Sequence, residues 1–186
     1  MNSDKVILDA CCGGRTFWFN KHHPNAVYVD KREMDRQTIW TSKDGTMTRE
    51  FEVHPDIIAD FTKLPFEDES FWHVVFDPPH LTRTGEGSWL ATKYGRLDGD
   101  WRETIRKGFW ECMRVLKPHG TLVFKWNETD IPVREILKIF GGGGETPVRS
   151  KNKQKRHDDL ACVYEAAGGR GMTGRGNPPG WERRET

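Results

Sequence analysis

The chain has 186 residues and a net charge of +1, which suits one domain and gives no global field that would draw it to nucleic acid or to a membrane surface. Hydrophobic residues make up 35% and charged residues 31%, so we expect part of the chain to lie outside the core. No signal peptide and no apolar run of membrane-spanning length is present, which predicts a cytoplasmic protein without a membrane partner.

Apolar runs and turn residues predict strands in the first half of the chain. Short strands are expected at residues 5–10, 26–30, 57–60 and 71–76. The Asp44-Gly45 pair, flanked by β-branched and apolar residues, predicts a tight hairpin between Ile39 and Val53. Two prolines after Phe76 forbid the continuation of the last strand.

The second half alternates helices with a strand. Residues 81–98 are polar and glycine-rich with interspersed aromatics, which predicts a long loop. Residues 100–116 carry apolar side chains at helical spacing, with Asp100 as the N-cap and a stop at Lys117-Pro118-His119-Gly120. A strand at 121–126 and a helix at 132–140 follow. This order predicts an α/β fold, a Rossmann-like three-layer α/β/α arrangement with a mostly parallel sheet.

The pattern ends at the glycines 141–144. Beyond them Gly, Arg, Lys, Asn and Pro dominate, and large apolar residues are few. We therefore expect one domain over residues 1–140 and a disordered tail over residues 141–186.

The turn after the first strand is the first candidate site. Leu8-Asp9-Ala10-Cys11-Cys12-Gly13-Gly14 joins a strand to small residues, which lets a cofactor approach the backbone closely. The pattern is Asp-x-x-x-Gly, not the Gly-x-Gly-x-x-Gly of dinucleotide enzymes. An ordinary strand–helix turn is the alternative.

Acids follow two further strands. Asp30 ends the second strand, where a carboxylate can accept both hydroxyls of a ribose. Asp60, followed by Phe61, ends the third strand, but it can equally cap the following turn. A surface acid at a strand end is the alternative for Asp30.

The segment Asp77-Pro78-Pro79-His80 follows a buried strand, where ligands bind in open α/β sheets. Because proline cannot donate a hydrogen bond, the Asp77 carboxylate and the Pro78 carbonyl form an acceptor-only edge that can hold the hydrogens of an amino group. The ring of His80 can stack on a planar substrate or take up a proton. The alternatives are a rigid turn and an ordinary polar histidine.

Basic and aromatic residues alternate in the predicted loop beside this segment. They are Arg83, Trp89, Lys93, Tyr94 and Arg96. The loop is either a lid that cups a base or a phosphate, or a solvated surface loop. The four cysteines, Cys11, Cys12, Cys112 and Cys162, show no zinc spacing, so we expect reduced thiols and no metal site.

From residue 4 to about 140 the chain resembles class I S-adenosylmethionine-dependent methyltransferases, and more narrowly small phage and prophage methyltransferases with an Asp-Pro-Pro-His motif. The matching segments are residues 7–15, 29–33, 60–66, 75–81, 114–120 and 124–127. The resemblance implies S-adenosyl-L-methionine as the cofactor and the cytoplasm of a bacterium or phage-infected cell as the location. It implies cofactor-binding roles for Asp9, Ala10, Cys11, Gly13, Asp30, Asp60 and Phe61. It implies catalytic roles for Asp77, Pro78, Pro79 and His80.

The chain departs from these proteins at its end. They usually close with a strand carrying Thr-x-Trp and Phe-Met-Lys, which this sequence lacks. Codons for residues 158–165, shifted by one nucleotide, can read Thr-Thr-Trp-Leu-Ala-Phe-Met-Lys. We hypothesise that the reading frame slipped within the glycines 141–144, so that the tail is a frame-shift product and C-terminal strands are missing or altered. Coding DNA incompatible with the shifted peptide refutes this.

The resemblance and the motifs together predict methyl transfer to an amino nitrogen, first to adenine N6 or cytosine N4 in nucleic acid. The alternatives are methylation of a protein glutamine or a small molecule, and an inactive protein that only binds the cofactor. No separate target-recognition domain fits in this length, so specificity would need the 81–98 loop, a homodimer or a partner.

Overall fold

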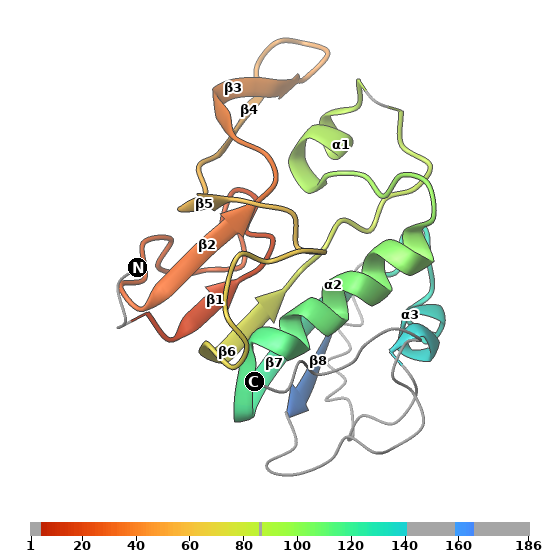
Figure 1. Ribbon diagram of the computed structural model, residues 1–186. Helices are drawn as coiled ribbons and strands as arrows, with labels where there is room; N and C mark the ends of the chain where they lie inside the picture. The colour runs from red at the N-terminus through yellow and green to blue at the C-terminus, as the bar shows by residue number, and fades with distance from the viewer. Residues whose placement is uncertain (1–4, 86, 141–158, 166–186) are drawn as a thin grey trace.

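The computed structural model describes residues 5–85, 87–140 and 159–165, with the backbone alone described over most of the last segment. Its main element is a six-stranded sheet in the order β5-β2-β1-β6-β7-β8 (Figure 1). The strands are β1 (Ile7–Asp9), β2 (Ala26–Asp30), β5 (Ile57–Ile58), β6 (Phe71–Phe76), β7 (Leu116–Asn127) and β8 (Asp159–Glu165). A separate two-stranded hairpin consists of β3 (Met34–Thr41) and β4 (Thr48–Val53). The helices are α1 (Trp89–Tyr94), α2 (Trp101–Val115) and α3 (Val133–Ile139).

The order of the strands places a topological switch point in the middle of the sheet. From β1 the chain builds outward through β2 to β5, then returns to the other side of β1 with β6 and β7. All of these pairs are parallel, and Leu8 of β1 lies in register with Val27 of β2 and with Val74 of β6. The mostly parallel, Rossmann-like fold is therefore confirmed, and a ligand crevice is expected above β1 and β6.

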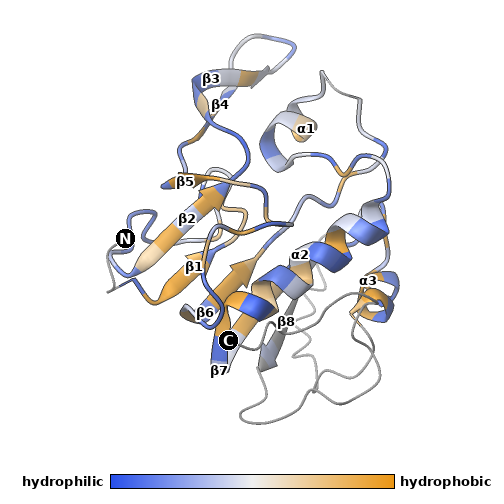
Figure 2. Ribbon diagram, viewed as in Figure 1, coloured by the Kyte–Doolittle hydropathy of each residue, from blue (hydrophilic) through white to orange (hydrophobic). Residues whose placement is uncertain are grey.

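Successive side chains of a strand point to opposite faces of the sheet, and the sheet accordingly has a hydrophobic cluster on each face. The larger cluster contains Leu8 and Val29 and is covered by α2 and α3, whose apolar stripes face the sheet (Figure 2). The smaller cluster contains Tyr28 and Cys12, and Trp18 from the segment between β1 and β2 packs against it. At β1 and β2 an irregular segment thus forms the layer opposite α2.

Most predicted elements are confirmed. Strands β2 and β6 have the predicted bounds, and the hairpin turns at Asp44-Gly45. The prediction of one long loop over residues 81–98 is wrong, because α1 lies within it. Ser88 caps this helix by accepting a hydrogen bond from the Leu90 amide at 3.3 Å, and Gly95 ends it with φ 74°. These two capping residues are the signal that the loop interpretation overlooked.

The tail contributes one strand to the sheet. Strand β8 pairs antiparallel with β7 from Thr121 to Asn127, at the place where missing or altered C-terminal strands were expected. The sequence Leu-Ala-Cys-Val-Tyr at 160–164 is a β-prone run that can pair with the open edge of β7. Residues 141–158 and 166–186 lie outside the described residues, so the frame-shift hypothesis and the tail boundary stay predictions. Among the described helices, none has the length and apolar character to cross a membrane.

Gly108 lets α2 lie close against the sheet. A Cβ atom at this position would lie 2.4 Å from Cδ2 of Phe61 and 2.8 Å from Cζ of Phe76. We expect Gly108→Val to lower the free energy of unfolding by about 2 kcal/mol or more, because overpacking forces both rings to move. Urea denaturation measures this. Gly85→Val is the control, because nothing lies within 4 Å of a Cβ there; equal losses in the two variants would contradict the packing argument.

Candidate active site

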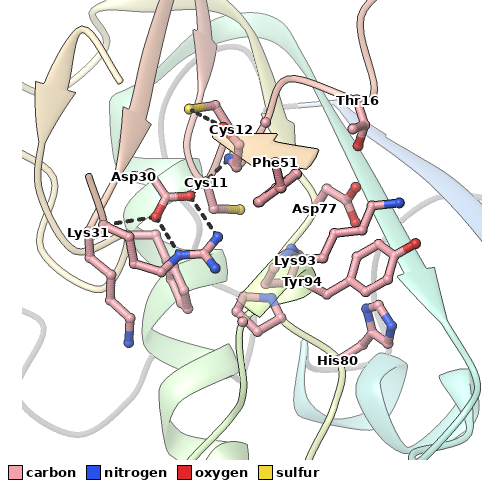
Figure 3. A pocket seen from close by; sticks show the side chains of 17 residues that line it. Cys11, Cys12, Thr16, Asp30, Lys31, Phe51, Asp77, His80, Lys93 and Tyr94 are labelled. Carbon is pink, nitrogen blue, oxygen red and sulfur yellow. Dashed lines mark hydrogen bonds and ion pairs between the residues drawn. The ribbon is translucent and has the colours of Figure 1, made fainter. Parts of the chain in front are cut away.

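A cleft opens at the carboxyl ends of β1, β2 and β6, at the switch point of the sheet. Figure 3 shows Cys11, Asp30 and Lys31 on one side of it, and Asp77, His80, Lys93 and Tyr94 gathered on the other. The lining residues are Cys11, Cys12, Gly13, Gly14, Thr16, Asp30, Lys31, Arg32, Phe51, Phe61, Asp77, Pro78, Pro79, His80, Lys93, Tyr94 and Gly95. The turn after β1 and the Asp-Pro-Pro-His segment are distant in sequence, but they line the same cleft.

The glycine turn forms the wall between β1 and β2. Gly13 has φ 48°, a conformation that disfavours a side chain, and its amide donates to Oδ2 of Asp30 at 2.9 Å. A Cβ at Gly14 would lie 2.5 Å from the ring of Phe51 in β4. Small residues here thus allow the hairpin to close over the turn while leaving the backbone accessible from the cleft.

Asp30 is buried and fully hydrogen-bonded in this structure. Besides the Gly13 amide, it accepts the Arg32 amide at 2.9 Å and the Arg32 Nε at 3.1 Å on Oδ1, and the Arg32 Nη2 at 3.4 Å on Oδ2. Nη1 of the same guanidinium donates to the Thr92 carbonyl of α1 at 3.1 Å. A ribose that uses both Asp30 oxygens must therefore displace the Arg32 guanidinium.

Asp9 lies beneath the cleft, 2% exposed, and is not among the lining residues. Burial raises the pKa of Asp9 to about 7; the hydrogen bond from Trp18 Nε1 at 2.7 Å opposes this shift, and the nearby Asp77 adds to it. An acid at this depth is poised between its two protonation states near neutral pH. A cation in the cleft would favour the ionised form.

Asp77 leads the segment that follows β6. Both of its carboxylate oxygens accept from Nζ of Lys125 in β7, at 3.0 Å and 3.2 Å, and both side chains are 24% exposed. Phe76 and Phe124 are partners in the β6–β7 register, so the next residue on each strand falls at the same edge. Pro78 and Pro79 line the cleft beside Asp77.

His80 reaches the cleft but is only 7% exposed. Its ring contacts two aromatic rings: Tyr94 is tilted against it at a centroid distance of 5.3 Å, and Trp126 meets it edge-on at 6.4 Å. Tyr94 is 37% exposed and lines the cleft. The more exposed ring of the pair formed by Tyr94 and His80 therefore belongs to α1 rather than to the Asp-Pro-Pro-His segment.

Of the remaining predicted residues, one lines the cleft and two do not. Phe61 is buried against Phe76 and lines the cleft. Asp60 is exposed and caps its own turn, accepting the Thr62 amide at 2.9 Å and the Thr62 hydroxyl at 2.8 Å. Ala10 is 1% exposed and lies below the lining, where its amide donates to the Val75 carbonyl. Asp60 thus has the capping contacts of the alternative interpretation.

Three residues that contact the predicted acids were missed from the sequence. Arg32 holds Asp30, Lys125 holds Asp77 and Trp18 holds Asp9. Only Arg32 could have been found from the sequence, since it lies two residues after its partner Asp30. Lys125 and Trp18 reach their partners through sheet register and chain reversal, which spacing alone does not encode.

Three acids, Asp9, Asp30 and Asp77, interact electrostatically around the cleft floor. Carboxylates in a partly buried site favour a cationic ligand and hydrogen-bond donors such as amines and hydroxyls. Among the described residues, no group of three or more His, Cys, Asp or Glu side chains is arranged to hold a metal ion.

Neither protein-family models nor curated proteins match the chain. Among solved structures, an S-adenosylmethionine-dependent methyltransferase from Methanosarcina mazei aligns with a TM-score of 0.48 at 11% identity, covering 91% of this chain and 95% of that chain. A proposed rRNA methylase from Clostridium thermocellum aligns with a TM-score of 0.48 at 14% identity, covering 87% and 89%. The antibiotic-resistance methyltransferase Kmr aligns with a TM-score of 0.38 at 14% identity, covering 87% of each chain. These are likenesses of overall arrangement at low identity.

Proposed function

We propose that this chain is an enzyme, an S-adenosylmethionine-dependent methyltransferase. Within that class, we propose an amino nitrogen as the methyl acceptor, with adenine N6 or cytosine N4 of nucleic acid as the first choice. The observation that carries the proposal is that the glycine turn and Asp30 share one cleft, at the switch point, with the Asp77-Pro78-Pro79-His80 segment. One half suits a cofactor and the other suits an amine.

The residues of the first half fit this cofactor. The open backbone at Gly13 admits close approach, Asp30 offers a bidentate partner for a ribose, and Asp9 offers a carboxyl group under the cleft that a cation would ionise. Phe61 offers an apolar wall for a flat ring. S-adenosylmethionine would supply an electrophilic methyl group on a positively charged sulfur, which the carboxylates favour.

The residues of the second half orient the acceptor. An exocyclic amine is a poor nucleophile because its lone pair is delocalised into the ring. Asp77 and the Pro78 carbonyl accept its two hydrogens, which favours a pyramidal nitrogen with its lone pair aimed at the methyl group. As the nitrogen–carbon bond forms, the carbon–sulfur bond breaks, its electron pair stays on sulfur, and one proton leaves the nitrogen for solvent. The chain contributes position and charge rather than covalent chemistry.

If the acceptor lies in a duplex, the base must be flipped out of the stack to reach Asp77. We expect single-stranded substrates to react faster, because they avoid this cost. Initial rates of methyl transfer to the single-stranded and duplex forms of one oligonucleotide test this expectation.

Transfer of label from tritiated cofactor onto DNA, RNA and protein pools tests the proposal. Label in DNA or RNA supports the nucleobase acceptor, and label in protein alone indicates the glutamine alternative. Label in a small-molecule extract alone indicates a small-molecule acceptor.

A second candidate, a protein that binds the cofactor without transferring its methyl group, is favoured by one observation. Lys125 occupies both oxygens of Asp77, where the amine would bind. No label in any pool, together with cofactor binding by calorimetry, would establish this second function instead.

Arg32 competes with the ribose for Asp30, so its removal should tighten cofactor binding. We expect Arg32→Ala to lower the cofactor dissociation constant about 1.4- to 5-fold, because displacing a partly exposed ion pair costs about 0.2–1 kcal/mol. Isothermal titration calorimetry measures the change. Arg36→Ala is the control, since Arg36 pairs with Glu50 on the outer hairpin. Weaker binding by Arg32→Ala would instead assign the guanidinium to the cofactor.

A further inference from the structure

We propose that Tyr94 supplies the ring that stacks on the methyl acceptor, with His80 buried behind it as its support. This inference rests on the proposed methyl transfer and identifies the acceptor as a planar heteroaromatic base. It assigns the stacking role to a residue outside the Asp-Pro-Pro-His segment.

Burial decides between the two rings. His80 is 7% exposed and packs against Tyr94 and Trp126, so little of its ring is open to a ligand. Tyr94 is 37% exposed and lines the same half of the cleft as Asp77 (Figure 3). A base whose amine reaches Asp77 therefore meets Tyr94 before it meets His80.

Several contacts fix Tyr94 at this place. The next residue, Gly95, fits against the motif, because a Cβ there would lie 3.0 Å from Cγ of Pro79. The Leu97 amide donates to the Leu81 carbonyl at 2.8 Å, which ties the segment after α1 to the segment after the motif. A ring held in this way loses little entropy on binding a ligand.

The charge beside Tyr94 also fits a nucleotide. Nζ of Lys93 lies 4.7 Å from the centre of the Tyr94 ring, and both residues line the cleft. Stacking on an aromatic ring with a cation nearby is how proteins bind bases of single-stranded nucleic acid. A glutamine side chain offers no comparable stacking face.

The test uses a single-stranded DNA oligonucleotide with one 2-aminopurine, whose fluorescence is quenched on stacking. We expect the native protein to quench the probe and Tyr94→Ala to bind it about 5- to 150-fold more weakly. Tyr94→Phe keeps the ring and should bind within about 2-fold of the native protein. The cofactor dissociation constant, measured by calorimetry, should be unchanged in both variants, which also shows that they are folded.

Trp72→Ala is the matched control. Trp72 is 50% exposed and has Nζ of Lys117 5.0 Å from its ring, but it lies at the amino end of β6, away from the cleft. The Trp72→Ala variant should bind the probe like the native protein. Native-like binding by Tyr94→Ala, or equal losses in Tyr94→Phe and Tyr94→Ala, would overturn the inference, as would absence of quenching by the native protein.

The two levels of the proposal fail separately. If the probe stacks in a way that depends on Tyr94 but no pool accepts a methyl group, the enzyme hypothesis is refuted and the base-binding site is supported. If methyl groups are transferred to protein and the probe does not stack, the methyltransferase hypothesis is supported and the stacking role of Tyr94 is refuted.

Discussion

Asp77→Asn is expected to lower the rate constant of methyl transfer about 100- to 1,000-fold, while the cofactor dissociation constant stays within about 2-fold of the native value. The amide keeps the volume of the carboxylate but loses the negative charge and one acceptor oxygen. An amine held by a single acceptor is then misaligned with the methyl group. Single-turnover transfer of tritium measures the rate constant, and calorimetry measures the affinity.

Asp68→Asn is the control for this prediction. Asp68 also pairs with a cation, Arg114 at 2.8 Å, but lies just before β6 at the opposite end of the strand from the cleft. It should transfer methyl groups at the native rate. Unchanged turnover in Asp77→Asn would refute the role of Asp77, and equal losses in both variants would point to a general fault in folding.

Lys125 makes the result more informative. Because Lys125 holds both oxygens of Asp77, an amine must share or displace its ammonium group. In Asp77→Asn this ammonium loses its charge partner at a site that is only 24% exposed. The loss of transfer therefore includes the effect of an uncompensated cation beside a positively charged sulfur. A double variant with Lys125→Met separates the two effects.

The position of the site could be predicted because it follows from the ends of strands. Strands β2 and β6 are apolar runs bounded by an acid and by prolines, and the structure gives them the predicted bounds. Parallel strands place their carboxyl ends at one edge, so Asp30 and Asp77 had to converge. That much depends only on local patterns and on the topology of the sheet.

The partners of these acids could not be predicted because they depend on three-dimensional register. Lys125 meets Asp77 only because β7 pairs with β6 in one particular register. The burial of His80 depends on α1, a six-residue helix within a segment whose composition indicates a loop. Short helices with weak periodicity are decided by their caps and packing rather than by propensity. The proposed base-stacking role therefore falls on Tyr94 rather than on His80.

Asp9→Asn is expected to stabilise the cofactor-free protein by up to about 4 kcal/mol at about pH 8. Burial raises the pKa of Asp9 to about 7 from an ordinary value of 3.8, so the folded state holds a proton that the unfolded state releases. The native protein therefore loses stability as the pH rises from about 4 through about 7, and this loss levels off above that. Asparagine cannot ionise, so its stability lacks this dependence, while its amide oxygen can still accept from Trp18. Urea denaturation across this pH range measures the divergence between the two proteins.

The same substitution should weaken cofactor binding, which links the cost of burying Asp9 to its function. A positively charged ligand above Asp9 favours its ionised form, so binding to the native protein should release a proton below about pH 7 and tighten as the pH rises towards that value. In Asp9→Asn both the proton release and this pH dependence should disappear. Calorimetry in buffers of different ionisation enthalpy counts the protons. Asp60→Asn is the control, since Asp60 is exposed and caps a turn. A stability difference between Asp9→Asn and the native protein that does not vary with pH would show that Asp9 is already ionised in the free protein, and that its charge is balanced without the cofactor.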